Sequence, residues 1–165
     1  MRVLGADPGI SNLGLAAVEG DAKAARLLFA RVLTTRPGAP ASERVGKLYQ
    51  GVLTAIEEAE PEALALEAQY FYRQNERAFQ VGWAVGALLA AAYARDLPVY
   101  AYGPMQIKKA LVGHGRAEKA QVAFMVRALL GLARPLSPSH AADAAAVALA
   151  HLATPPWGQR EHLFR

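Results

Sequence analysis

The first third of the chain consists of short apolar runs separated by turn residues, a pattern typical of β-strands with short connections. Apolar and β-branched residues dominate positions 3–6, 13–18 and 27–35. Asp-Pro-Gly at 7–9 and Arg-Pro-Gly at 36–38 follow the first and third of these runs. Because proline and glycine mark turns, we predict three consecutive strands that form an antiparallel meander.

The hydrophobic period becomes that of a helix after position 42. Val45, Leu48 and Val52 recur at intervals of three and four residues, which places them on one helix face. Ser42 stands where an N-cap is expected, and Pro61 bounds the segment. We therefore predict a helix between these two residues.

The same signals predict two further strands and four further helices. The strands are expected at 63–67 and 99–102, and the helices at 75–95 (capped by Asn75), 104–112, 116–132 and 137–151 (capped by Ser137, with Pro138 in the first helical position). This order indicates an α/β fold whose five-stranded mixed sheet continues the meander by two parallel crossovers and is flanked by helices. We expect one domain over 1–153 and a flexible tail over 154–165.

The composition restricts the class of protein. Hydrophobic residues make up 53% of the 165 positions, but 36 of them are alanine, so fewer large side chains are available for a core than the percentage suggests. A chain of this length can still bury one compact core. The absence of cysteine excludes disulfides and thiolate zinc sites. The apolar runs at 3–6 and 81–94 are too short for a signal peptide and a membrane helix, respectively. We therefore expect a soluble, cytoplasmic protein with no membrane partner, whose net charge of +4 permits a polyanionic one.

Three acidic residues stand at positions where a fold places few charges. Asp7 closes the first strand, Glu67 closes the fourth, and Asp143 lies among alanines. Taken singly, they can be a turn residue, an exposed strand end and a helix N-terminal acid. Carboxylates that converge without lysine or arginine repel one another, and a bound divalent cation relieves that repulsion. His140 shares a helix face with Asp143 and completes a predicted metal site, although a single histidine is more often a core or surface residue.

Three other stretches each allow two interpretations. The aromatic and polar run at 70–75, Tyr-Phe-Tyr-Arg-Gln-Asn, either continues a strand or stacks on unpaired bases. The small residues Gly82, Gly86 and Ala90 let the long helix approach either the protein's own sheet or another element. A cluster of basic residues forms either a solvated helix face or a track for DNA phosphates. Its members are Lys108, Lys109, His114, Arg116, Lys119 and Arg127.

Several of these segments, in this order, resemble the RuvC family of Holliday-junction resolvases. The resemblance runs from Val3 to about His151 and rests on residues 7–9, 65–67 with the aromatics that follow, 103–108, 113–119, 125–127 and 141–144. It implies a ribonuclease-H-like fold and a homodimer that works with a branch-migration motor. It also implies an endonuclease that nicks two strands of a four-way DNA junction symmetrically, in recombination and repair, with carboxylate-held magnesium.

The resemblance carries roles to particular residues. It makes Asp7 the first catalytic acid and metal ligand, Glu67 the second and Asp143 the last, with Asp7 shared between two magnesium ions. His140 stands where many members carry an acid, so we expect it to be a ligand or to orient a water, and manganese to substitute more readily for magnesium. The resemblance also implies that the long helix belongs to the dimer interface, that Tyr70 (with Phe71 as close competitor) stacks on a base, and that Lys108 and Lys119 contact the DNA backbone. From the residue types themselves, we add Arg73, Gln74, Asn75, Lys109 and Arg116 as expected DNA contacts.

Two other classes of protein share some of these features. An ATP-binding protein of the actin and sugar-kinase type also has an acid and a glycine after its first strand, but it needs two such lobes. A junction-binding module that has lost catalysis, with His140 as the lesion, is the other alternative.

Overall fold

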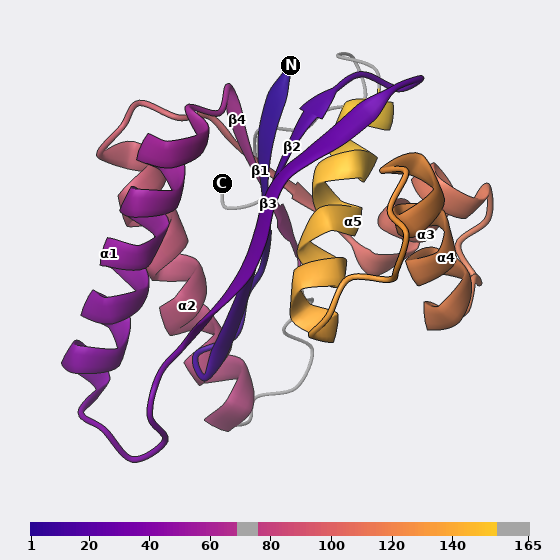
Figure 1. Cartoon of the computed structure of the whole chain (residues 1–165). Coiled ribbons are helices and arrows are strands. Elements are labelled where there is room, and N and C mark those ends of the chain that lie inside the picture. The colour runs from indigo at the N-terminus through magenta and orange to yellow at the C-terminus, as the bar shows by residue number, and fades with distance from the viewer. Residues whose placement is uncertain (69–75, 155–165) are drawn as a thin grey trace.

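The computed structural model describes residues 1–68 and 76–154. Within them, five strands form one mixed sheet in the order β3-β2-β1-β4-β5 (Figure 1). β1, β2 and β3 pair antiparallel, β4 runs parallel to β1, and β5 runs parallel to β4. The predicted meander with two parallel additions is confirmed. The strands are β1 Arg2–Asp7, β2 Asn12–Gly20, β3 Ala25–Thr34, β4 Ala63–Glu67 and β5 Val99–Tyr102.

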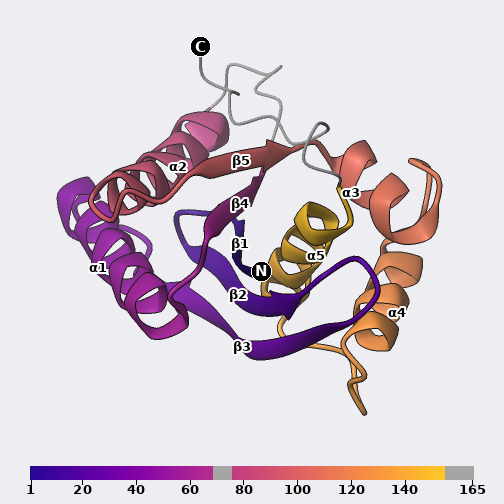
Figure 2. The same cartoon turned by 90° about the horizontal axis from the view of Figure 1, so that it is seen from above.

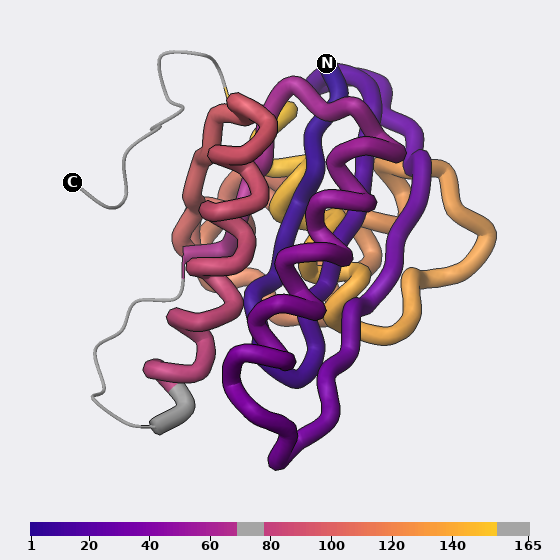
Figure 3. The backbone as a smooth tube through the Cα atoms, turned by 90° about the vertical axis from the view of Figure 1, so that its left-hand side faces the viewer, coloured from indigo at the N-terminus to yellow at the C-terminus, as the bar shows by residue number. Residues whose placement is uncertain are grey.

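Helices cover both faces of the sheet. α1 (Ala41–Ala59) and α2 (Glu76–Tyr93) lie side by side on one face, as Figure 3 shows. α5 (Ser139–Ala153) lies against the other face, and α3 (Pro104–Val112) and α4 (Lys119–Leu129) pack outside it (Figure 2). In the part of the chain that is described, no helix is long and apolar enough to cross a membrane.

Each face of the sheet has its own hydrophobic core. Alternate residues of a strand point to opposite faces. Leu4 of β1 therefore packs in the core beneath α1 and α2 with Leu48 and Leu88, whereas Val3 packs beneath α5 with Val147. Because β1 is buried on both faces, its sequence is a continuous apolar run rather than an alternating one.

The ends of three helices differ from those predicted. In each case a residue close by occupies the N-cap position, because caps depend on local backbone geometry that hydrophobic spacing does not specify. The observed N-cap residues are Pro40 for α1, Glu118 for α4 and Pro138 for α5, in place of Ser42, a start at Arg116, and Ser137. The predicted Asn75 cap and the tail beyond Thr154 lie outside the described residues.

Two glycines let α5 lie directly on the sheet. A Cβ atom on Gly5 of β1 would lie 2.1 Å from the Ala144 carbonyl oxygen, and one on Gly14 of β2 would lie 2.0 Å from the His140 carbonyl oxygen. Since real Cβ atoms do not approach backbone this closely, any larger residue would force the helix away. These two glycines therefore set the height of α5, and with it the place of the side chains at its start.

Candidate active site

The strands and α5 bring the predicted acids to one edge of the sheet. Asp7 and Glu67 are the last residues of β1 and β4, which are parallel neighbours with Ala6 opposite Leu66. Carboxyl ends of adjacent parallel strands share an edge, so the two acids are adjacent there. The first turns of α5 pass this edge and supply His140 and Asp143. The four residues predicted as a site from distant parts of the sequence thus lie at the same edge of the sheet.

Asp7 is the most deeply buried of the three acids, with 5% of its surface exposed. Its Oδ2 lies 2.7 Å from Nδ1 of His140. Because an ionised carboxylate only accepts hydrogen bonds, His140 donates from Nδ1 when Asp7 is charged. Burial raises the pKa of Asp7 and the charge on Asp143 raises it further, while the hydrogen bond from His140 opposes the rise. The histidine therefore orients Asp7 and stabilises its charged form.

The negative charges of the other two acids act on the pKa of Glu67 at the same edge. Burial, and then the negative charges of Asp7 and Asp143, raise the pKa of Glu67 to about 7. The positive charges of Lys119 and Lys108 act in the opposite direction. The three carboxylates therefore repel one another in the absence of a cation, as their convergence predicted.

Lys119 forms an ion pair with Asp143 that local sequence did not indicate. Its Nζ lies 2.9 Å from Asp143 Oδ2, and the pairing raises the pKa of Lys119. The lysine reaches the acid from the start of α4, 24 positions earlier in the chain. Its side chain is 70% exposed, so the pair contributes little to stability and can open.

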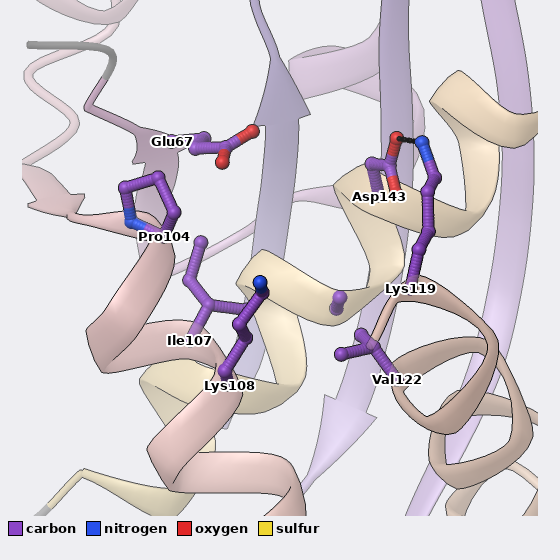
Figure 4. Close-up of a pocket in the computed structure, with 8 residues that line it drawn as sticks. Glu67, Pro104, Ile107, Lys108, Lys119, Val122 and Asp143 are labelled. Carbon is purple, nitrogen blue, oxygen red and sulfur yellow. Dashed lines mark hydrogen bonds and ion pairs between the residues drawn. The ribbon is translucent and has the colours of Figure 1, made fainter. Parts of the chain in front are cut away.

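A pocket adjoins the acids. Its volume is about 300 Å³, and it lies between α3 and α4 with α5 behind it. Figure 4 shows Glu67 and Asp143 on opposite sides of it, with Lys108 and Lys119 extending from the two flanking helices. The other lining residues, which sequence reasoning missed, are Pro104, Ile107, Val122 and Ala146.

The side chains at this edge fit a divalent cation by their chemistry. Carboxylate oxygens and a neutral imidazole are ligands for magnesium or manganese, and the mutual repulsion of Asp7 and Glu67 is what a cation relieves. In this conformation, no three His, Asp or Glu side chains among the described residues are close enough together to hold a metal ion. Asp143 is paired through its Oδ2 with Lys119, so the lysine competes with a cation for this carboxylate.

The other predicted contacts fall into three groups. Lys108 lines the pocket. Lys109 and Arg116 are exposed and follow Lys108 closely in the sequence. Arg127 donates to the Leu132 carbonyl oxygen 3.2 Å away, so its guanidinium stabilises the end of α4. Tyr70, Phe71, Arg73, Gln74 and Asn75 lie outside the described residues.

The small-residue stripe of α2 faces outward. Gly82, Gly86 and Ala90 are exposed, and a Cβ atom added to either glycine would meet nothing within 4 Å. The alternative that this stripe packs against the protein's own sheet is therefore wrong. Phe79 and Tyr93, near the two ends of the same helix, are 67% and 86% exposed.

A buried pair holds the far end of α5, and sequence reasoning missed it. The Tyr102 hydroxyl lies 2.7 Å from Nδ1 of His151, which is 0% exposed. Burial lowers the pKa of His151 to about 4, so this histidine is neutral at pH 7 and joins α5 to β5. The one signal in the sequence was a polar residue at the end of an alanine-rich helix.

The fold and the site together define a class. A mixed sheet of this order, with acids at the ends of two parallel strands and two further polar side chains on the helix that crosses them, is the arrangement of a ribonuclease-H-like nuclease. The comparison with known proteins identifies the family.

The family described as crossover junction endodeoxyribonuclease RuvC matches residues 3–151. A relative of that name from Thermus thermophilus is 56% identical over 92% of this chain and 93% of its own length. The Thermus thermophilus RuvC structure has a TM-score of 0.90 at 52% identity, covering 97% of this chain and 99% of that one. A second structure, that of T. thermophilus RuvC in complex with a Holliday junction substrate, has a TM-score of 0.88 at 55% identity and covers 92% of each chain.

This chain belongs to the RuvC family of crossover junction endodeoxyribonucleases. It is therefore an enzyme of the class that hydrolyses DNA phosphodiester bonds, and divalent-metal dependence in general follows from the family. Neither the ATP-binding protein nor the module without catalysis is favoured by these matches.

Proposed function

We propose that this chain, as a nuclease domain over residues 1–153, resolves four-way DNA junctions in recombination and repair by nicking two strands at symmetric positions. The observation that carries the proposal is the meeting of Asp7, Glu67 and Asp143 at one sheet edge, beside a pocket flanked by two lysines. Such a site has carboxylates for a cation and positive charge for a DNA backbone.

The four polar side chains divide the work. Two bound magnesium ions, with manganese as substitute, would supply an acidified water and offset the phosphate charge. Asp7 would be the central carboxylate that holds them, with Glu67 and Asp143 as the flanking ligands. His140 keeps Asp7 oriented through its Nδ1 and presents its other ring nitrogen as a ligand or to a water.

We assign the basic side chains in and near the pocket as contacts to the DNA backbone. Lys108 and Lys119, at the pocket, bind phosphates near the cut, and Lys109 and Arg116 extend this contact along the strand. Phosphate contacts of this kind give affinity without sequence choice. By family resemblance we add the segment at 70–75 as the contact with unpaired bases, where Tyr70 or Phe71 stacks beside Arg73, Gln74 and Asn75.

We infer that the second strand is cut by a second copy of the chain. The outward stripe of α2, with Gly82 and Gly86 open to close approach, suits a two-fold contact between identical helices. Such a dimer presents two equal sites to the equal arms of a junction. We extend the proposal to work in the cytoplasm, alongside a branch-migration motor, on the family resemblance.

The test is a nicking assay on a synthetic four-way junction. We expect metal-dependent nicks at symmetric positions in two strands, and none with chelator. Asp7→Asn should abolish nicking while junction affinity changes by less than about threefold, since Asp7 is not one of the proposed backbone contacts. Nicking by Asp7→Asn at the wild-type rate would refute the site.

A further inference from the structure

The pocket beside the acids has an apolar wall that the proposed chemistry leaves unused. The carboxylates of Glu67 and Asp143 serve the metal, and the two lysines serve phosphates. Ile107 of α3, Val122 of α4 and Ala146 of α5 line the same pocket and contribute only hydrocarbon to it. The wall is therefore suited to a part of the substrate that is not charged.

The occupant must combine negative charge with an apolar surface. Lys108 and Lys119 extend from opposite helices around the pocket, as Figure 4 shows, and the apolar residues lie between those helices. A nucleotide has this character, because its phosphate is anionic and its sugar and base present apolar faces. The volume of about 300 Å³ lies at the lower end of the range for pockets that enclose a small organic ligand.

We propose that this pocket receives the sugar and base of a nucleotide that flanks the cut phosphodiester bond, and that its apolar wall selects that nucleotide by size. The proposal rests on the nuclease function proposed above and adds a source of cleavage preference to it. Hydrocarbon side chains form no hydrogen bonds to base edges, so direct readout of a base pattern is not expected from them.

Lys119 connects this pocket to the catalytic acids. It pairs with Asp143, and its high exposure lets it move. When a phosphate arrives with the nucleotide, the lysine has a second anion to pair with. Seating the nucleotide therefore draws Lys119 from Asp143 and leaves that carboxylate available to the metal.

The test combines a variant whose pocket is narrowed by a larger side chain with DNA junctions that lack one base beside the nick. Val122→Phe narrows the pocket, and junctions are prepared with an abasic site at either nucleotide flanking the nick. With enzyme in excess over junction and Mg²⁺ present, we expect Val122→Phe to cut intact junctions about tenfold more slowly than the wild type. An abasic site at one of the two positions should restore cutting to within about threefold of the wild type on that substrate.

Two further variants keep the result interpretable. Ala128→Phe places the same ring on the exposed side of α4, away from the pocket, and should cut both substrates at wild-type rates. Val122→Ala enlarges the pocket and should raise the cutting rate with a purine at the selected position relative to that with a pyrimidine. This variant adds no aromatic side chain that the fold would have to accommodate.

The results of these experiments distinguish the nucleotide pocket from the nuclease function on which it rests. Equal slowing of Val122→Phe on intact and abasic junctions, together with an unchanged purine-to-pyrimidine ratio for Val122→Ala, overturns the nucleotide pocket while wild-type nicking stands. If the wild type does not nick junctions with metal, the nuclease function itself fails.

Discussion

His140 Nδ1 lies 2.7 Å from Asp7 Oδ2, which joins the start of α5 directly to the acid at the end of β1. The contact spans 133 positions of sequence. It makes the orientation of the central carboxylate depend on the helix that carries Asp143.

His140→Ala should slow nicking by about 10- to 100-fold, because Asp7 loses the group that orients it. His140→Asp places a carboxylate ligand at this position and should retain more activity than the alanine variant in Mg²⁺. Single-turnover rates on a four-way junction measure both. Equal rates for His140→Ala and wild type would show that the contact has no part in the reaction.

Glu67→Gln should stabilise the metal-free protein at high pH. The fold raises the pKa of Glu67 to about 7, so the protonated form is favoured below that pH, and stability is lost as pH rises through 7 and the proton leaves. The glutamine variant should be more stable than wild type by about 1 to 2 kcal/mol at pH 8 and show a vanishing difference near pH 4.5. Urea unfolding in chelator measures this.

The matched control is Glu43→Gln, which removes an exposed acid from the first turn of α1. At pH 8 it should not stabilise the protein, because Glu43 is not among the charges that shift the pKa of Glu67 and an acid in the first turn of a helix is favourable. A Glu67→Gln variant that loses stability at pH 8 would mean that Glu67 is ionised and favourably paired there.

The metal requirement should itself depend on pH. Protons compete with the cation for Glu67, so the Mg²⁺ concentration for half-maximal nicking should rise by up to about tenfold for each unit that pH falls below 7. Titrations of nicking rate against Mg²⁺ at pH 5.5, 6.5 and 7.5 give this dependence. A constant half-saturating concentration would exclude Glu67 from the ligands.

Gly14→Ala should displace α5 and impair the site. The added Cβ would lie 2.0 Å from the His140 carbonyl oxygen, and overpacking of this kind costs about 1 to 3 kcal/mol. Thermal unfolding should show the loss, with slower nicking at a temperature where the variant is folded. Gly46→Ala in α1, where a Cβ meets nothing, should stabilise by about 0.5 to 1 kcal/mol.

Gly86→Arg should separate the proposed dimer. The substitution adds a long charged side chain in the middle of the outward stripe of α2, where an identical helix would approach. Sedimentation velocity should show monomers, and paired nicking of a junction should fall at least about tenfold. Since Gly86 is exposed, the variant should fold as the wild type does, which circular dichroism would confirm. A dimer that persists would place the interface elsewhere.

The acidic site was largely predictable because its members are strand ends and helix-face neighbours. Asp7 and Glu67 each follow a short buried run, and parallel strands bring such ends together. His140 and Asp143 lie one helical turn apart, a spacing fixed by the helix itself. These are local features, and the order of elements then restricts how they meet.

What sequence reasoning missed depends on contacts between elements. The pairing of Lys119 with Asp143 follows from how α4 packs beside α5, and nothing within a few positions of either residue indicates it. The pocket wall joins Ile107, Val122 and Ala146 from three helices. Helix caps were missed for a related reason, since they depend on backbone geometry at a single residue.

The five strands, the approximate extents of the helices, the candidate acids and the family could be predicted from the amino-acid sequence, because hydrophobic period, turn residues and ordered motifs are properties of the chain. The folded protein was needed to show how near α5 lies to the sheet, which basic side chain pairs with which acid, and which surface of α2 stays open. Those depend on close packing, where one Cβ at Gly5 or Gly14 shifts a helix. No periodic pattern encodes such a distance.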